Sequence, residues 1–95
     1  MDSAIVITPI VHLNGNSYTS LIEALEHAYS AVMDATEALR QTAPNGRNYY
    51  PEPGRLQRAE RQHAERLAHL KAVMDSLQAE AIQLSDETPD ALKRR

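Results

Sequence analysis

Several residue types that usually guide the interpretation of a small protein are missing from this chain. Its 95 residues include no cysteine, no tryptophan and no phenylalanine. Without cysteine the chain has neither a disulfide framework nor a thiolate metal site, which suits a reducing compartment. The longest apolar run, residues 4–7, is far short of the roughly 20 residues that span a bilayer and too short for a signal-peptide core. We therefore predict one small domain inside a cell, without a membrane partner.

Lysine and arginine are absent from the first 39 positions, which carry five acidic residues. Residues 40–71 hold seven basic and three acidic side chains and residues 72–95 hold three and five, so the three segments carry −5, +4 and −2 and sum to −3. Because duplex nucleic acid is bound through many phosphate contacts, this overall acidity argues against a duplex partner. The basic segment fits a local site for a small anion, or weak surface ion pairs between an acidic first helix and a basic second one.

The first 17 residues predict an extended arm that ends in a turn. Residues 4–13 are rich in β-branched side chains, and Pro9 restricts them to an edge strand or an extended arm. Residues 14–17, Asn-Gly-Asn-Ser, have the composition of a turn. The spacing of Ser20 and Glu23 fits a capping box that opens a helix, and Asn16 or Ser17 is the alternative cap one turn earlier.

Two long segments, residues 18–42 and 54–84, have apolar residues at alternating steps of four and three, which indicates amphipathic helices. The predicted seam residues are Leu21, Leu25, Ala28, Val32, Ala35 and Leu39 in the first helix and Leu56, Ala59, His63, Leu67, Leu70, Met74, Leu77, Ala81 and Leu84 in the second. Pro44 and residues 51–54 interrupt the helices and define a loop over 43–53, and residues 85–95 predict a flexible polar tail. The predicted fold is all-α: an antiparallel two-helix hairpin over 18–84 with an extended N-terminal arm over 1–17.

A hairpin of two helices buries one face of each, so it cannot enclose a core. The first helix carries a second apolar stripe, Ile22, Tyr29, Met33 and Thr36, and the arm adds further apolar surface. In a monomer too little of this surface would leave water to offset the loss of chain entropy. We therefore predict assembly into a homo-oligomer.

Recognised catalytic arrangements are missing as well. There is no Gly-rich phosphate loop, no GxSxG segment and no convincing Ser-His-Asp set, so we do not expect an enzyme. No two of His12, His27, His63 and His69 are four residues apart, and neither a metal nor a cofactor is expected.

The loop between the helices holds Arg47, Tyr49 and Tyr50, and these two rings are half of the chain's four tyrosines. A connection that only reverses the chain needs about two to eight residues of Gly, Asn or Pro character. Guanidinium binds phosphate through a planar fork and an aromatic face stacks on a base, so the loop fits a nucleotide-like anion, with Arg55 as a second cation. The alternative is structural: the two rings cap the helix pair and are buried there.

A second polar cluster, residues 12–17, precedes the first helix and includes His12 and Asn14. A helix of about 24 residues is roughly 36 Å long, so this cluster and the loop are expected at opposite ends of one hairpin. In an antiparallel oligomer the start of this helix in one subunit would lie beside the loop of another, where its backbone donors would join Arg47 in an inter-subunit site. The alternative is that the cluster forms only an N-cap turn.

The two clusters together resemble a family of small phage and prophage proteins. HLNGNS at 12–17 is similar to that family's HLNG-T-S turn, and PNGRNYYP at 44–51 is similar to its P-N-x-R-D-Y-Y-P loop. QHAERL at 62–67 matches its helix rich in H-x-x-R-L, so the resemblance covers residues 10–84. Asn16 and Asn48 stand where the family has Thr and Asp, and the missing carboxylate weakens a role in orienting Arg47 or receiving a ligand hydroxyl.

The resemblance implies a phage accessory protein, similar in architecture to phage sponges of the anti-CBASS and anti-Thoeris type, which sequester nucleotide immune signals. The predicted function is therefore capture of a small cyclic nucleotide signal in the host cytoplasm. The residues expected to bind it are Arg47 and Arg55 at phosphate, Tyr49 or Tyr50 at a base, and His12 with Asn14 at base or ribose edges. The alternative is a phage structural or protein-interaction module in which the apolar arm docks a partner protein.

The histidine spacing generates a prediction about metal content. Protein purified without a tag is expected to contain no stoichiometric metal, because no carboxylates complete a shell around any pair of histidines. Elemental analysis tests this, and one zinc ion per chain would contradict it.

Overall fold

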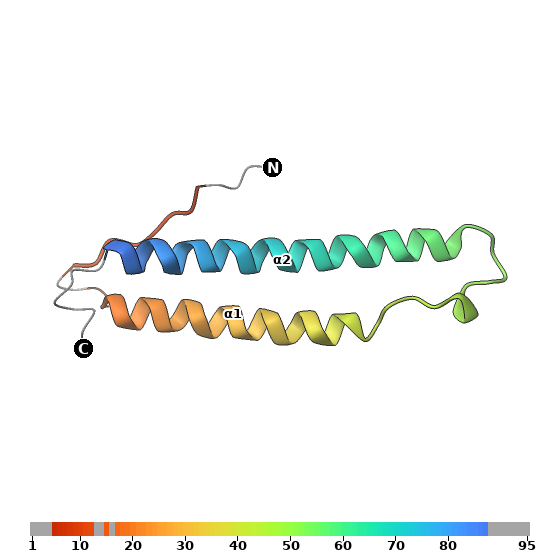
Figure 1. The fold of residues 1–95 in the computed structure, drawn as a ribbon, viewed down its shortest axis with the longest axis horizontal. Coiled ribbons are helices and arrows are strands. Elements are labelled where there is room, and N and C mark those ends of the chain that lie inside the picture. The colour runs from red at the N-terminus through yellow and green to blue at the C-terminus, as the bar shows by residue number, and fades with distance from the viewer. Residues whose placement is uncertain (1–4, 13–14, 16, 88–95) are drawn as a thin grey trace.

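The computed structural model describes residues 5–12, 15 and 17–87. Two helices, α1 (Tyr18–Arg40) and α2 (Arg55–Glu87), lie antiparallel and side by side, joined by a loop that contains the short 3-10 helix η1 (Gly46–Asn48) (Figure 1). The predicted all-α hairpin is confirmed, with no strand among the described residues. Residues 85–87, predicted as the start of the tail, belong to α2, since no glycine or proline follows Gly54 until Pro89. The rest of the predicted tail lies outside the described residues.

The two ends of α1 follow from side-chain and backbone hydrogen bonds. Ser17 is the N-cap: its Oγ accepts a hydrogen bond from the Ser20 backbone N–H at 3.1 Å, so the predicted capping box at Ser20 is wrong and the alternative cap is the real one. At the other end the N–H groups of residues 41–43 bond to carbonyls three residues back, at 3.1, 2.9 and 3.2 Å. This tightened turn ends α1 at Arg40, two residues before the predicted end, ahead of Pro44.

The seam between the helices matches the predicted seam in all but one position. Every predicted seam residue of α2 is at least half-buried, and Leu84 is the only fully buried side chain in the described part of the chain. On α1, Ala35 is exposed and Thr36 is half-buried instead, with its Oγ1 2.8 Å from the Val32 carbonyl oxygen and 3.8 Å from Met74 Sδ. A strict heptad assumes 3.5 residues per turn, whereas a straight helix has 3.6, which explains the shift.

The hairpin is elongated, with extents of 63 × 25 × 21 Å. Its radius of gyration is 19.1 Å, whereas a compact chain of this length has about 12 Å. Its accessible surface is 7381 Å², whereas a compact monomer of 10.6 kDa exposes about 5500 Å². One chain therefore leaves roughly 1900 Å² more surface in water than a compact fold would.

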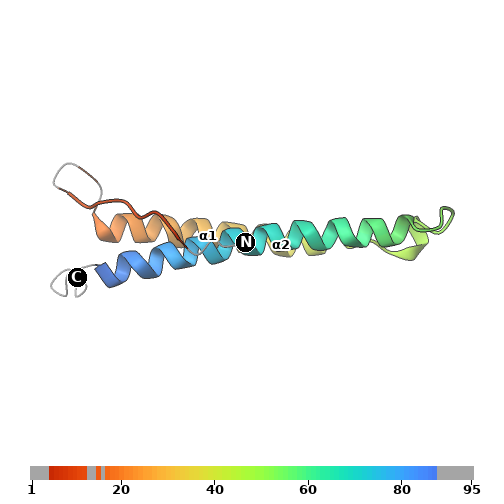
Figure 2. The same cartoon turned by 90° about the horizontal axis from the view of Figure 1, so that it is seen from above.

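Residues 5–12 form an extended arm that folds back from the start of α1 across the C-terminal part of α2 (Figures 1 and 2). Its side chains alternate between two environments. Val6, Thr8 and Val11 are half-buried, whereas Ile5, Ile7 and Ile10 are 82–84% exposed. Of the two predicted forms, the extended arm is the one observed, and it presents an apolar edge to solvent.

The seam generates a prediction about stability. Leu70→Asp is expected to lower the free energy of unfolding by about 3 kcal/mol or more, because a carboxylate on the seam loses water without gaining a partner. Ala72→Asp, at an exposed position two residues along and on the opposite side of α2, should cost about 0.5 to 1 kcal/mol through helix propensity alone. Chemical denaturation followed by circular dichroism measures both, and equal losses would contradict the seam.

Candidate functional site

The loop end of the hairpin is built on the part of α2 that extends past α1. α2 has 33 residues and α1 has 23, so the first turns of α2 lie beside the returning loop (Figure 1). Asn45 caps η1, with its Oδ1 accepting the Asn48 N–H at 3.2 Å. Gly46 packs against Leu56, because a Cβ placed on the glycine would lie 3.8 Å from Leu56 Cδ2. The loop is thus shaped by its own asparagine cap and by a contact with α2.

The predicted binding side chains of the loop face water. Tyr50 is 80% exposed and Arg47 is exposed, whereas Tyr49 is half-buried and its backbone bonds to Gly46 and Glu52. If the two tyrosines only capped the helix pair, both rings would be buried, and the exposed ring of Tyr50 does not meet that condition. The binding hypothesis needed a concave pocket, and neither of the two grooves found between the helices is lined by a loop residue. A single hairpin therefore presents these groups without enclosing a ligand.

Arg55 is engaged by a neighbour within the chain. Glu52 Oε1 lies 2.7 Å from Arg55 Nη2, and Glu52 Oε2 lies 2.5 Å from Arg58 Nη2. Between them Gly54 has a φ of +84°, which favours glycine and turns the chain into α2. The carboxylate thus ties the loop to the first turn of α2, and Arg55 can hold a phosphate only where Glu52 releases it. The sequence analysis did not include Arg58, because a spacing of six residues from Glu52 is not a helical pair spacing and the contact depends on the turn at Gly54.

Three other arginines of the basic segment have no ion pair within the part of the chain that the structure describes. Arg40 pairs with Glu37 at 3.3 Å and Lys71 with Asp75 at 2.9 Å, whereas Arg47, Arg61 and Arg66 make no salt bridge with any described residue. Arg47 lies in the loop, and Arg61 and Arg66 lie in the N-terminal half of α2. This half of the hairpin is therefore the part that attracts anions.

The described segment just before α1, which includes His12, lies at the opposite end of the hairpin from the loop, as the predicted helix length required (Figure 1). The side chain of His12 is exposed, and its carbonyl oxygen accepts the Gly15 N–H at 3.1 Å. A Cβ on Gly15 would be 2.9 Å from His12 Nε2, so the imidazole lies against the glycine and leaves no space for a side chain there. Asn14, the other predicted residue of this cluster, lies outside the described residues. One chain does not bring the two clusters together.

Comparison with models of known protein families, with curated proteins and with solved structures finds no match to this chain. Among the described residues, no helix has the length and hydropathy to cross a membrane. No group of three histidine or acidic side chains in that part of the chain could hold a metal ion. The functional conclusion therefore depends on the residues and geometry of this chain.

The contact of Glu52 generates a prediction about its titration. The pKa of the Glu52 carboxyl lies below its usual 4.5, mainly because Arg55 donates a hydrogen bond to it and secondly because Arg58 does. Because this pKa is lower in the folded state, the contact stabilises the loop above pH 4.5, and its contribution is lost as the pH falls through the lower value. NMR titration should show Arg55→Gln raising the pKa of Glu52 more than Arg58→Gln does. Arg61→Gln should leave it unchanged; an unchanged pKa in all three variants would contradict the contact.

Proposed function

We propose that this protein is a phage-encoded, non-enzymatic binding protein that captures a small, cyclic nucleotide signal between the subunits of a homo-oligomer. One observation carries the proposal: Arg47 has no ion pair with any described residue, and it lies on the same ordered loop as the 80% exposed ring of Tyr50. An exposed aromatic ring and a guanidinium without an ion pair among the described residues suit a flat anion, because the ring offers a face for stacking and the guanidinium a planar fork for phosphate. The expected place of action is the host cytoplasm.

Each group has a defined role in this proposal. Arg47 donates two parallel hydrogen bonds to a phosphate, and Tyr50 stacks on a base, with the half-buried Tyr49 supporting the loop. A second subunit supplies His12, Asn14 and the start of its α1, whose backbone donors favour negative charge. Arg55 contributes only after the ligand replaces Glu52 as its partner.

A second candidate function has its own supporting observation. Ile5, Ile7 and Ile10 of the arm are each more than 80% exposed, which is the apolar edge that a protein-interaction or virion-assembly module would use. In that case the loop is only a connection between the helices, and nucleotides do not bind.

The two functions are separated by variants of the loop. Arg47→Ala is expected to cost about 1.5 to 3 kcal/mol of nucleotide binding, or roughly ten- to a hundredfold in affinity, because a charge-assisted hydrogen bond is lost. Tyr50→Ala should cost about 1 to 3 kcal/mol, and Tyr50→Phe should restore most of it, since stacking needs the ring face and not the hydroxyl. Arg66→Ala is the matched control, as another exposed arginine without an ion pair among the described residues.

The measurement is retention and heat release of cyclic and linear nucleotides by the pure protein, followed by chromatography, with a melting curve for each variant. Loss of retention in Arg47→Ala and Tyr50→Ala at unchanged melting temperature supports the proposal. If no nucleotide is retained by the wild type, or if the loop variants bind as well as Arg66→Ala does, the proposed site is wrong.

A further inference from the structure

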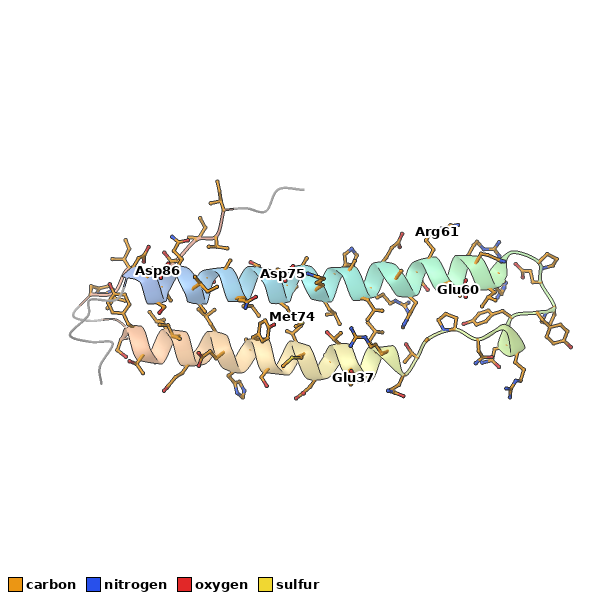
Figure 3. All side chains as sticks on the ribbon, viewed as in Figure 1. Glu37, Glu60, Arg61, Met74, Asp75 and Asp86 are labelled. Carbon is orange, nitrogen blue, oxygen red and sulfur yellow. The ribbon has the colours of Figure 1, made fainter. Side chains whose placement is uncertain are left out.

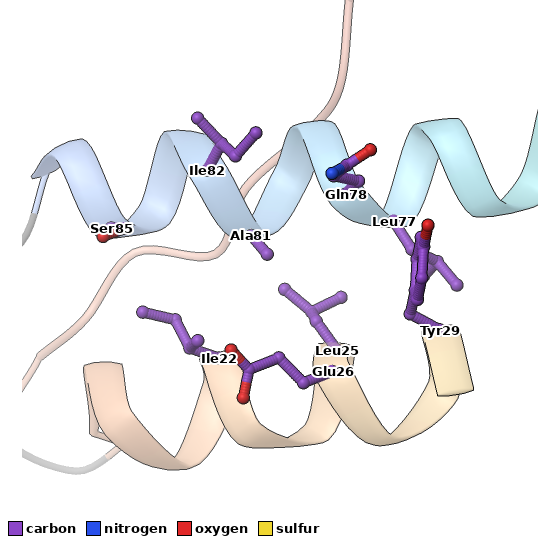
Figure 4. Close-up of a pocket in the computed structure, with 9 residues that line it drawn as sticks. All are labelled: Ile22, Leu25, Glu26, Tyr29, Leu77, Gln78, Ala81, Ile82 and Ser85. Atoms are coloured by element: carbon purple, nitrogen blue, oxygen red, sulfur yellow. The ribbon is translucent and has the colours of Figure 1, made fainter. Parts of the chain in front are cut away.

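Two grooves lie on one face of the hairpin and are lined by the second apolar stripe of α1. The groove near the arm has a volume of about 390 Å³ and runs between Ile22 and Tyr29 on α1 and Ile82 on α2 (Figure 4). The groove near the middle has a volume of about 780 Å³ and is lined by Met33 and Leu67, among others. The lining positions of α1 are 22, 25, 26, 29, 33, 34, 36, 37 and 40. All of them except 34 follow steps of three and four, so both grooves lie on the same face.

This groove face is not covered by the described part of the arm. In the close-up of the groove the arm passes behind α2, on the far side of the helix pair (Figure 4). Met33 remains 48% exposed and Ile82 remains 55% exposed. The surplus of roughly 1900 Å² over a compact monomer exceeds the about 800 Å² that each partner buries in a stable interface. The chain therefore has enough uncovered surface for a partner as large as itself.

We propose that the groove face binds a second copy of this chain in the antiparallel direction, with the two-fold axis passing beside Met33. Face-to-face packing of two antiparallel hairpins with this symmetry lays α1 against α1 and α2 against α2. The pairing does not require that the protein bind a nucleotide.

Charge selects the antiparallel direction. The arm end carries Glu23, Glu26, Glu80, Asp86 and Glu87 without a lysine or an arginine among the described positions of that end. In a parallel pair the acidic arm ends of the two chains would lie against each other, and their like charges would repel. In the antiparallel pair Glu26 meets Arg40 of the second copy, because each lies seven residues from Met33 along α1. Arg61 and Asp86 lie toward opposite ends of α2 (Figure 3), so the antiparallel pair sets the basic end of one copy against the acidic end of the other.

Cysteine cross-linking tests the pairing without background, because the native chain has no cysteine. Met33→Cys is expected to form a covalent dimer of twice 10.6 kDa under mild oxidation, since a residue beside a two-fold axis meets its own copy within disulfide range. Val73→Cys is the matched control: its native side chain is 46% exposed, close to the 48% of Met33, but it does not line either groove. Glu26→Cys should not cross-link to itself but should cross-link to Arg40→Cys in a mixed sample.

Cross-linking of Met33→Cys together with the mixed pair, but not of Val73→Cys, supports the antiparallel interface. Equal cross-linking of Met33→Cys and Val73→Cys, or self-cross-linking of Glu26→Cys, overturns it. As a measurement that does not depend on oxidation, Glu26→Arg should raise the dimer dissociation constant at least about tenfold, and adding Arg40→Glu should restore it. Failure of that rescue also overturns the proposal. Both tests are done without nucleotide, so their outcome is independent of the proposed function.

Discussion

The seam between α1 and α2 buries one face of each helix, and the rest of the structure depends on how little that seam encloses. Two helices in contact have no interior, so the seam side chains are half-buried and only Leu84 is fully covered among the described residues. The remaining apolar groups, on the arm and along the groove face, stay in water. Hydrophobic burial within one chain is correspondingly small compared with the entropy lost on ordering 95 residues.

The same elongated shape accounts for the arrangement of the polar groups. It places Arg47 of the loop and the first arginines of α2 at one end and the N-terminus of α1 at the other, so neither end is a closed site in one chain. An antiparallel second copy would bring the ends together, cover the groove face and match the basic end with the acidic end. The proposed self-association and the proposed ligand capture both rest on this one geometric constraint, and each can be tested without the other.

The periodic features of the fold were predictable from sequence because they depend on local spacing. The 4-3 repeat identified the seam of α2 and the second stripe of α1, which lines the grooves. The errors fell where several weak preferences competed: Ser17 rather than Ser20 caps α1, and Thr36 rather than Ala35 joins the seam. The ion pairs of Glu52 with Arg55 and Arg58 were not predictable, since they depend on how Gly54 turns the chain into α2. The roles of Arg47, Tyr49, Tyr50, His12 and Asn14 remain predictions.

The central claim is that this hairpin is stable only when its uncovered apolar face is buried by another copy. The most direct test is the melting temperature as a function of protein concentration, combined with sedimentation equilibrium at each concentration. Because folding coupled to association depends on mass action, the melting temperature should rise with concentration and the mass should exceed 10.6 kDa. A melting temperature independent of concentration, for a stable species of 10.6 kDa, would contradict the account.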